Sequence, residues 1–150
     1  MRRVRIVIAG FIIVCCLLTA CNPYNEKSAV TIVPFEDRSI DFSYETESDD
    51  IIVYTLTNKS EDTYLVGNQF RLEYCDNEEW YCVPYKPFTV FSMEGMIMPQ
   101  GDTREFKVKL SRIFDDLPDG HFRLIKDIGS YDNPGGKDFS IAIEFDYPFN

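Results

Sequence analysis

Histidine is almost absent from this chain of 150 residues, and its scarcity excludes several kinds of chemistry. The only histidine, His121, stands between Gly120 and Phe122 at an expected junction between a turn and a strand. A serine–histidine–acid triad needs a histidine beside the nucleophile, and no Gly-x-Ser-x-Gly motif marks any serine. Acidic residues cluster in expected turns, where solvation accounts for them. We therefore expect a protein that is not an enzyme and that uses no cofactor.

A surplus of basic residues is also missing. The sequence has 15 Lys and Arg residues against 25 Asp and Glu residues, a formal charge of −10. Such a charge is repelled by phosphate backbones, so we expect no nucleic acid among the partners of this protein. Internal repeats and coiled-coil heptads are absent as well. About 120 residues follow the N-terminal region, enough for one domain with its own core and too few for two.

No hydrophobic run is long enough to cross a membrane comfortably. Residues 6–18 are apolar without charge or proline, and they follow three arginines within residues 1–5. A membrane span needs about 20 apolar residues, whereas a positively charged start and a shorter apolar run are typical of an export signal. The run ends in Leu18-Thr19-Ala20-Cys21, which resembles the bacterial lipobox. In that family the cysteine thiol is acylated with diacylglycerol, and the signal is cut just before it.

The resemblance to the lipobox implies a signal peptide at residues 1–20 and a lipid anchor on Cys21. Residues 22–28 are polar and predict a short tether. Three of the fifteen basic residues and none of the acidic residues lie in residues 1–20, so the mature chain has a formal charge of −13. We expect the anchor to hold the domain at the extracytoplasmic face of the cell membrane. Cys15 and Cys16 then belong to the removed segment.

The hydrophobic period of residues 29–150 is two rather than 3.6. In residues 51–58, for example, Ile52, Tyr54 and Leu56 share one face, as in a strand with one buried side. A helical turn is expected at 111–117. Strands are expected at 29–35, 39–45, 51–58, 70–75, 80–83, 103–110, 121–128 and 138–147. Seven to nine short strands separated by turn signals predict an all-β fold, a sandwich of two antiparallel sheets.

Four stretches resemble, in the right order, the bacterial Ig-like domain of many small lipoproteins. They are "LTNKSEDTY" (56–64), "LEYCDNEEWYCVPY" (72–85), "MPQGDTREFKVKL" (98–110) and "LPDGHFRLIKDI" (117–128). The resemblance implies an immunoglobulin-like β-sandwich over residues 29–150. These motifs consist mostly of turn residues, so they indicate a fold rather than a function. The family is of unknown function and supplies no catalytic residues.

Cys75 and Cys82 flank the expected hairpin at residues 70–83. An exported protein meets an oxidising environment, where two remaining thiols favour a disulfide. If Asn77 and Glu78 form the turn, Cys75 faces Trp80 and the two cysteines are diagonal neighbours, about 7–8 Å apart. Bridging that distance requires a bulge or extra twist. A metal site would need two more ligands, and His121 is the only histidine available.

A dense run of aromatic residues is the best candidate for a binding surface. An alternating hairpin must turn some of these rings outward, and exposed aromatic rings are a usual basis of recognition. We expect this surface to contact an envelope protein or polymer. Its residues are Trp80, Tyr81, Tyr85, Phe88 and Phe91.

Two alternative functions remain open from the sequence. The Asn-x-Ser and Leu-Pro-x-Gly turns also resemble the bacterial intracellular proteinase inhibitor domain, which implies an inhibitory loop, and the candidate is 83–88 with its two prolines. A soft-metal or thiol-redox lipoprotein would use Cys75 and Cys82, with copper held by thioethers of the segment 93–98. Methionines in a strand are more often core filler, so we assign no metal site.

Overall fold

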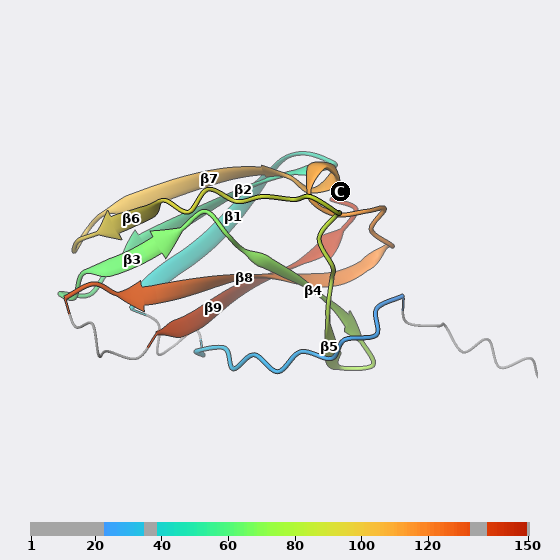
Figure 1. Ribbon diagram of the computed structural model, residues 1–150, viewed down its shortest axis with the longest axis horizontal. Coiled ribbons are helices and arrows are strands. Elements are labelled where there is room, and N and C mark those ends of the chain that lie inside the picture. Colours follow the sequence, from blue (N-terminus) through green and yellow to red (C-terminus); the bar gives the residue numbers. More distant parts are fainter. Residues whose placement is uncertain (1–22, 35–38, 133–137, 150) are drawn as a thin grey trace, which may run out of the picture.

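The computed structural model describes residues 23–34, 39–132 and 138–149 (Figure 1). The predicted signal peptide and Cys21 lie outside these residues. Within them, no helix has the length and apolar character needed to cross a membrane. A 3-10 helix, η2 (Leu110–Arg112), falls where a helical turn was expected. The strands are β1 (Ile40–Ser48), β2 (Ile51–Asn58), β3 (Tyr64–Gly67), β4 (Arg71–Asp76), β5 (Glu79–Cys82), β6 (Gly95–Met98), β7 (Thr103–Lys109), β8 (Gly120–Ser130) and β9 (Phe139–Tyr147).

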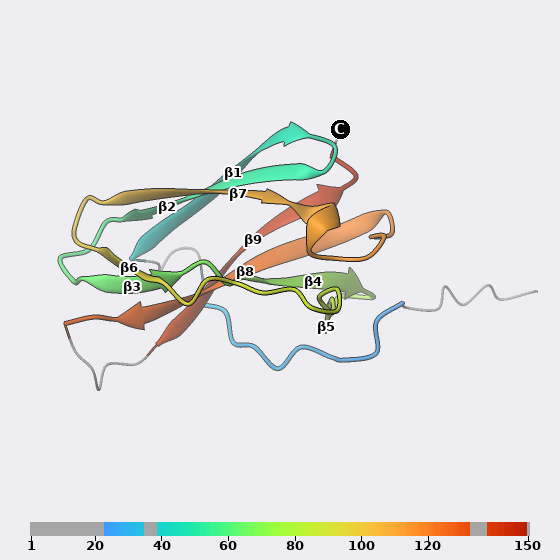
Figure 2. The ribbon, with the colours of Figure 1, turned by 45° about the horizontal axis from the view of Figure 1, so that its top comes forward.

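The strands form two sheets, which confirms the predicted antiparallel β-sandwich. One sheet has the order β1-β2-β7. The other has six strands in the order β5-β4-β8-β3-β6, with β9 paired to the remaining edge of β8. All strand pairs are antiparallel. Figure 2 shows the two layers turned so that β1, β2 and β7 lie above β8 and β9.

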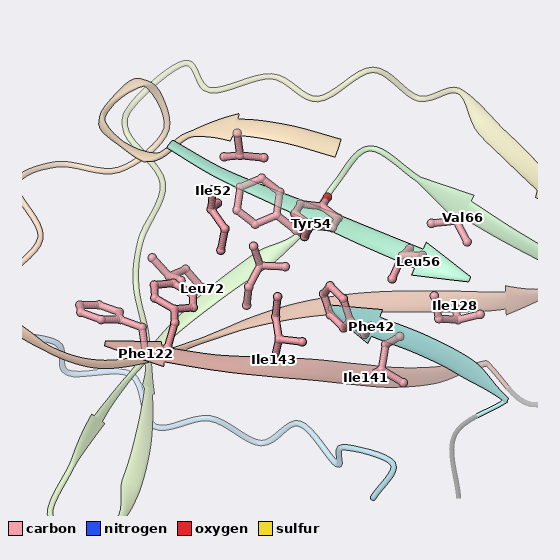
Figure 3. Packing of buried hydrophobic residues seen from close by; sticks show 14 of the residues in the cluster. Phe42, Ile52, Tyr54, Leu56, Val66, Leu72, Phe122, Ile128, Ile141 and Ile143 are labelled. Atoms are coloured by element: carbon pink, nitrogen blue, oxygen red, sulfur yellow. The ribbon is translucent and has the colours of Figure 1, made fainter. Parts of the chain in front are cut away.

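The core lies between the sheets and is built from the alternation that the sequence predicts. On β2 the side chains of Ile52, Tyr54 and Leu56 are fully buried, as expected. They face Leu72, Phe122 and Ile143 from the larger sheet (Figure 3). Aromatic rings pack closely in this layer: Tyr54 stacks on Phe106 with ring centres 4.9 Å apart. Burial of such apolar side chains contributes roughly 1.5–3 kcal/mol each.

The expected strands differ from the observed ones at two places. Residues 29–34, the described part of the strand expected at 29–35, do not form a strand; within them, Ile32 makes an isolated bridge to Ser140. The short strands β3 and β6 were not predicted, because four residues carry too little alternation to stand out. They pair with each other, and β3 also pairs with β8.

The β4–β5 hairpin has the predicted register. Asn77 and Glu78 occupy its turn with φ of 50° and 66°. Positive φ at both central positions belongs to the type I′ turn, which matches the twist of two antiparallel strands. Cys75 therefore pairs with Trp80, and Glu73 pairs with Cys82.

An interruption separates β3 from β4 along one edge of β8. Val66 pairs with Ile128 and Arg71 pairs with Ile125. Arg71 is five residues after Val66 in the sequence, whereas their partners on β8 are only three residues apart. The two additional residues leave carbonyl groups without a place in the ladder. The buried ammonium group of Lys126 binds two of these groups, Gly67 O at 2.5 Å and Gln69 O at 2.6 Å.

The N-terminal residues 23–34 form a strap across the outer face of the six-stranded sheet (Figure 1). At one edge the strap joins β5, through hydrogen bonds from Ser28 N to Trp80 O and from Cys82 N to Glu26 O. At the other edge, Val33 N donates to Ser140 O on β9. The described part of the predicted tether at 22–28 thus contacts the domain.

Under the strap lies a buried ion pair between neighbouring strands. The Arg123 guanidinium contacts the Glu73 carboxylate through Nε at 2.7 Å and Nη2 at 2.6 Å. The Ser28 hydroxyl donates to the same carboxylate at 2.5 Å. The Glu73 side chain is 1% exposed and that of Arg123 is 11% exposed, so the pair is shielded from solvent.

Candidate binding site

The five aromatic residues of the predicted binding surface do not lie on one surface. Trp80 faces the outside of the larger sheet, where its ring covers the Arg123 guanidinium at 4.4 Å. Tyr81 lies on the opposite face of β5 and donates a hydrogen bond to Glu79 Oε2 at 3.0 Å. These two side chains therefore take part in contacts within the domain.

Tyr85 and Phe91 are half-buried and pack against the core. Tyr85 stacks on Phe114 with ring centres 5.6 Å apart, and its hydroxyl donates to Phe70 O. Burial raises the pKa of Tyr85, as expected for a phenol enclosed in this way. Phe91 meets Tyr85 edge to face at 5.3 Å. Both rings fasten the β5–β6 connection to the sandwich.

Phe88 alone among the five is fully exposed. Its side chain is 99% exposed, and two neighbours along the chain, Val90 at 87% and Met93 at 100%, are similarly exposed. We call residues 88–93 the apolar segment. Large hydrophobic side chains left in water this completely contribute nothing to folding, and their concentration in one segment is typical of interaction sites.

The apolar segment is held at both ends by the domain. Lys86 N donates to Ile113 O at 2.8 Å, and its ammonium group donates to Ser111 O at 2.7 Å. At the far end, Asn68 Nδ2 donates to Ser92 Oγ at 3.0 Å. Phe88 itself has a φ of 66°, a left-handed conformation that is uncommon for a residue other than glycine. The segment thus presents Phe88 from a fixed base.

A groove separates the apolar segment from β7. It has a volume of about 830 Å³, within the usual range for binding sites in proteins. Its floor is aromatic and aliphatic, with Phe70, Phe91 and Phe106 among the lining residues. Basic side chains line it as well: Lys107, Lys109 and Arg112, against one acidic side chain, Glu105. The β5–β6 connection lines the groove through Thr89, Val90 and Phe91, across from β7.

The matched family model agrees with this architecture. A model described as bacterial Ig-like domain matches residues 39–146. The chain belongs to this family of bacterial Ig-like domains. The matched range spans the sandwich from the start of β1 to the penultimate residue of β9, including the apolar segment and the groove. The strap precedes it.

Among solved structures, a similar one has a low TM-score to this chain. It is titled "X-ray structure of Northeast Structural Genomics Consortium target SoR45", with a TM-score of 0.40 and 17% sequence identity. The similarity covers 75% of this chain and 89% of that chain. A comparison with curated proteins finds no match.

Cys75 and Cys82 of the Ig-like domain are unpaired in the structure, and the tentative disulfide between them stays a prediction. The hairpin register places them on diagonal positions of the β4–β5 ladder without a bulge between them, which disfavours a bridge. Burial, followed by the charge of Glu73, raises the pKa of Cys82 and so disfavours its thiolate.

The methionines considered for copper lie in different surroundings. Met98 is fully buried in the core, whereas Met93 is fully exposed on the apolar segment. Met96 and Met98 both lie on strand β6. Across the residues that the structure describes, no group of three or more His, Cys, Asp or Glu side chains is arranged to hold a metal ion.

Most of the groove was not predicted from the sequence. Its lining includes Val90, Phe106 and Ile113, which come from separate parts of the chain and lie outside the predicted aromatic surface. The lack of alternation in residues 86–94 could have indicated the exposed side chains. A segment without the period of a strand is not expected to bury all of its apolar residues.

Proposed function

We propose that this protein is a lipid-anchored, extracytoplasmic lipoprotein whose Ig-like domain binds a partner protein through the apolar segment. The observation that carries the binding function is the exposure of Phe88, Val90 and Met93 on a segment fastened at both ends. Binding does not have to order this segment, which lowers the entropic cost of association. Membership of the bacterial Ig-like family favours a non-enzymatic interaction module.

The strap supports a close attachment to the membrane. Tyr24 packs against Tyr74 with ring centres 5.6 Å apart, only three residues after Cys21. Three extended residues span about 10 Å, so a lipid on Cys21 would keep this edge of the domain near the bilayer. The apolar segment belongs to the other side of the sandwich (Figure 1), where a partner has access to it.

Membrane attachment is tested by Cys21→Ser in the full-length chain. We expect the variant to leave the membrane fraction, because it lacks the thiol that accepts the lipid. Mass spectrometry of the wild-type N-terminus should find an acylated Cys21. A variant that stays in the membrane pellet after a carbonate wash would contradict the anchor.

Partner binding is tested by a photo-crosslinking amino acid at position 88 in the full lipoprotein, in its native membrane. The matched control carries the same group at Tyr131, which is 49% exposed on another part of the surface. One protein captured from position 88 and not from position 131 is the expected result. Equal capture from both positions, or capture from neither, would argue against the apolar segment as the binding surface. A polysaccharide adduct at position 88 would show that the partner is an envelope polymer and not a protein.

The proteinase-inhibitor alternative receives one supporting observation, the firm attachment of the loop 83–88. A loop that enters a protease cleft as a substrate does has to run extended. Phe88 has a φ of 66°, outside the extended region. The partner captured at position 88 decides the matter, because the inhibitor function requires a protease.

A further inference from the structure

The edge of β7 that faces the groove is open. β7 pairs with β2 along one edge. In the part of the chain that the structure describes, no strand pairs with its other edge. Near its start this edge is covered, because Arg104 Nη2 donates to Ile97 O at 3.3 Å. From Glu105 to Lys109 it faces the groove. An open strand edge carries N–H and C=O groups that can pair with another extended chain.

The side chains of β7 alternate in a way that defines a complementary strand. Phe106 points inward and lines the apolar floor, whereas Glu105, Lys107 and Lys109 point outward. An added antiparallel or parallel strand has the same period of two. Its inward side chains would meet the floor, and its outward side chains would lie beside the lysines. The matching sequence therefore alternates apolar and polar residues.

Charge selects the polar residues of that sequence. The groove has three basic side chains and one acidic one, although the whole chain has a formal charge of −10. Lys107 also pairs with Glu47, and Lys109 lies 3.9 Å from Asp50. Arg112 is exposed and makes no ion pair with the described residues. Glu47 and Asp50 offset part of the charge of the two lysines, so the groove attracts an acidic segment chiefly through Arg112.

We infer that the groove binds an extended segment of the partner protein, which adds as a strand to β7 and alternates apolar with acidic residues. The apolar side chains enter the floor between Phe91, Phe106 and Ile113. The acidic side chains lie over Arg112 and over Lys107 and Lys109, where they compete with Glu47 and Asp50 for the ammonium groups. Backbone pairing supplies the affinity and the alternate side chains supply the selectivity, as in other cases of strand addition. This inference rests on the proposed function, because the apolar segment forms one wall of the groove.

The test uses a displayed library of random peptides, selected on the purified full-length lipoprotein. Enrichment of peptides that alternate apolar and acidic residues is expected. Peptides with basic residues, or no enrichment at all, would overturn the inference. The selected peptide is then measured against Lys107→Glu/Arg112→Glu, for which we expect at least about tenfold weaker binding. The matched control, Lys59→Glu, lies outside the groove and should bind as the wild type does.

N-methylation distinguishes strand addition from mere contact. The selected peptide is methylated at alternate backbone nitrogens in two versions of opposite parity. A strand directs every second N–H toward its neighbour, so one version should lose binding and the other should keep it. Equal affinities for the two versions would overturn the strand geometry. The lipoprotein alone is also tested for concentration-dependent dimers. If it forms them and the Lys107→Glu/Arg112→Glu variant does not, the groove binds a second copy of this chain and not a partner segment.

The crosslinking experiment separates this inference from the proposed function. If position 88 captures its partner equally in the wild type and in the Lys107→Glu/Arg112→Glu variant, the apolar segment binds and the groove does not. If the charge reversal abolishes capture while circular dichroism shows an intact fold, the partner uses both.

Discussion

The ammonium group of Lys126 donates a 2.6 Å hydrogen bond to the carbonyl oxygen of Gln69, in the gap between β3 and β4. This side chain has the inward parity of Phe122 and Ile128 and is fully buried. It also lies 4.9 Å from the ring centre of Phe106, which favours the charged form. Lys126 thereby joins the interrupted edge of the larger sheet to the aromatic layer beneath the groove.

Lys126→Met should destabilise the domain by about 2 kcal/mol, because the carbonyl groups of Gly67 and Gln69 lose their partner while the apolar stem is kept. Chemical denaturation followed by fluorescence measures the change. Lys59→Met is the control, since Lys59 pairs with Asp41 at the exposed surface. An unchanged midpoint for Lys126→Met would show that the two carbonyl groups need no donor.

Lys126 also predicts a pH dependence. Burial lowers its pKa from 10.5 to about 8. Between these values the unfolded chain keeps a proton that the folded protein has released, so the Lys126 contribution to stability rises with pH across this range. Urea titrations of the wild type and Lys126→Met at several pH values isolate this contribution. A difference between the two proteins that does not vary from pH 8 to 10.5 would contradict the shift.

Glu73→Gln should cost roughly 3 kcal/mol of folding free energy. The substitution leaves the Arg123 guanidinium without its counter-charge beneath Trp80, and an unpaired buried charge is strongly destabilising. Glu79→Gln on the same hairpin removes an exposed pair with Lys27 and should change stability little. Thermal unfolding of both variants gives the comparison. Similar effects at the two positions would mean that burial of the Glu73–Arg123 pair has no energetic consequence.

His121 should titrate above its ordinary range. Its Nδ1 lies 2.8 Å from Asp146 Oδ1 and its Nε2 lies 3.1 Å from Glu144 Oε2, and the bond to Asp146 is the main cause that raises its pKa. The stabilisation is present below the unfolded pKa of about 6.5 and is lost as pH rises through the folded value. NMR resolves this single histidine, and Asp146→Asn should lower its midpoint. A midpoint that Asp146→Asn leaves unchanged would refute the assignment.

Cys75 and Cys82 should both react with a maleimide without prior reduction. Cys82 should react more slowly than an unstructured thiol, because burial raises its pKa. Intact-mass spectrometry of the alkylated mature protein counts the modified thiols. Cys75→Ser/Cys82→Ser should unfold at nearly the wild-type temperature. A mass lower by two hydrogen atoms, without labelling, would show the disulfide that the register disfavours.

The sequence by itself determined the regular part of this protein. Alternation identified Ile52, Tyr54 and Leu56 as core residues, since a strand with one buried face permits only one pattern. The residues Asn77 and Glu78 indicated the hairpin register, because a two-residue turn sets which positions pair.

Only the tertiary structure decided the fate of the irregular segments. Phe88 and Phe91 are the same residue type three positions apart, yet one lies in water and the other packs on Tyr85. The local hydrophobic pattern does not distinguish the two rings. Their exposure differs because only the ring of Phe91 has another part of the domain to pack against. The polar composition of residues 22–28 predicts a tether. Ser28 and Glu26 nevertheless pair with β5, because β5 has a free edge, which the sequence of the tether cannot show. Contacts between distant parts of the chain, rather than local pattern, place the apolar segment and the groove.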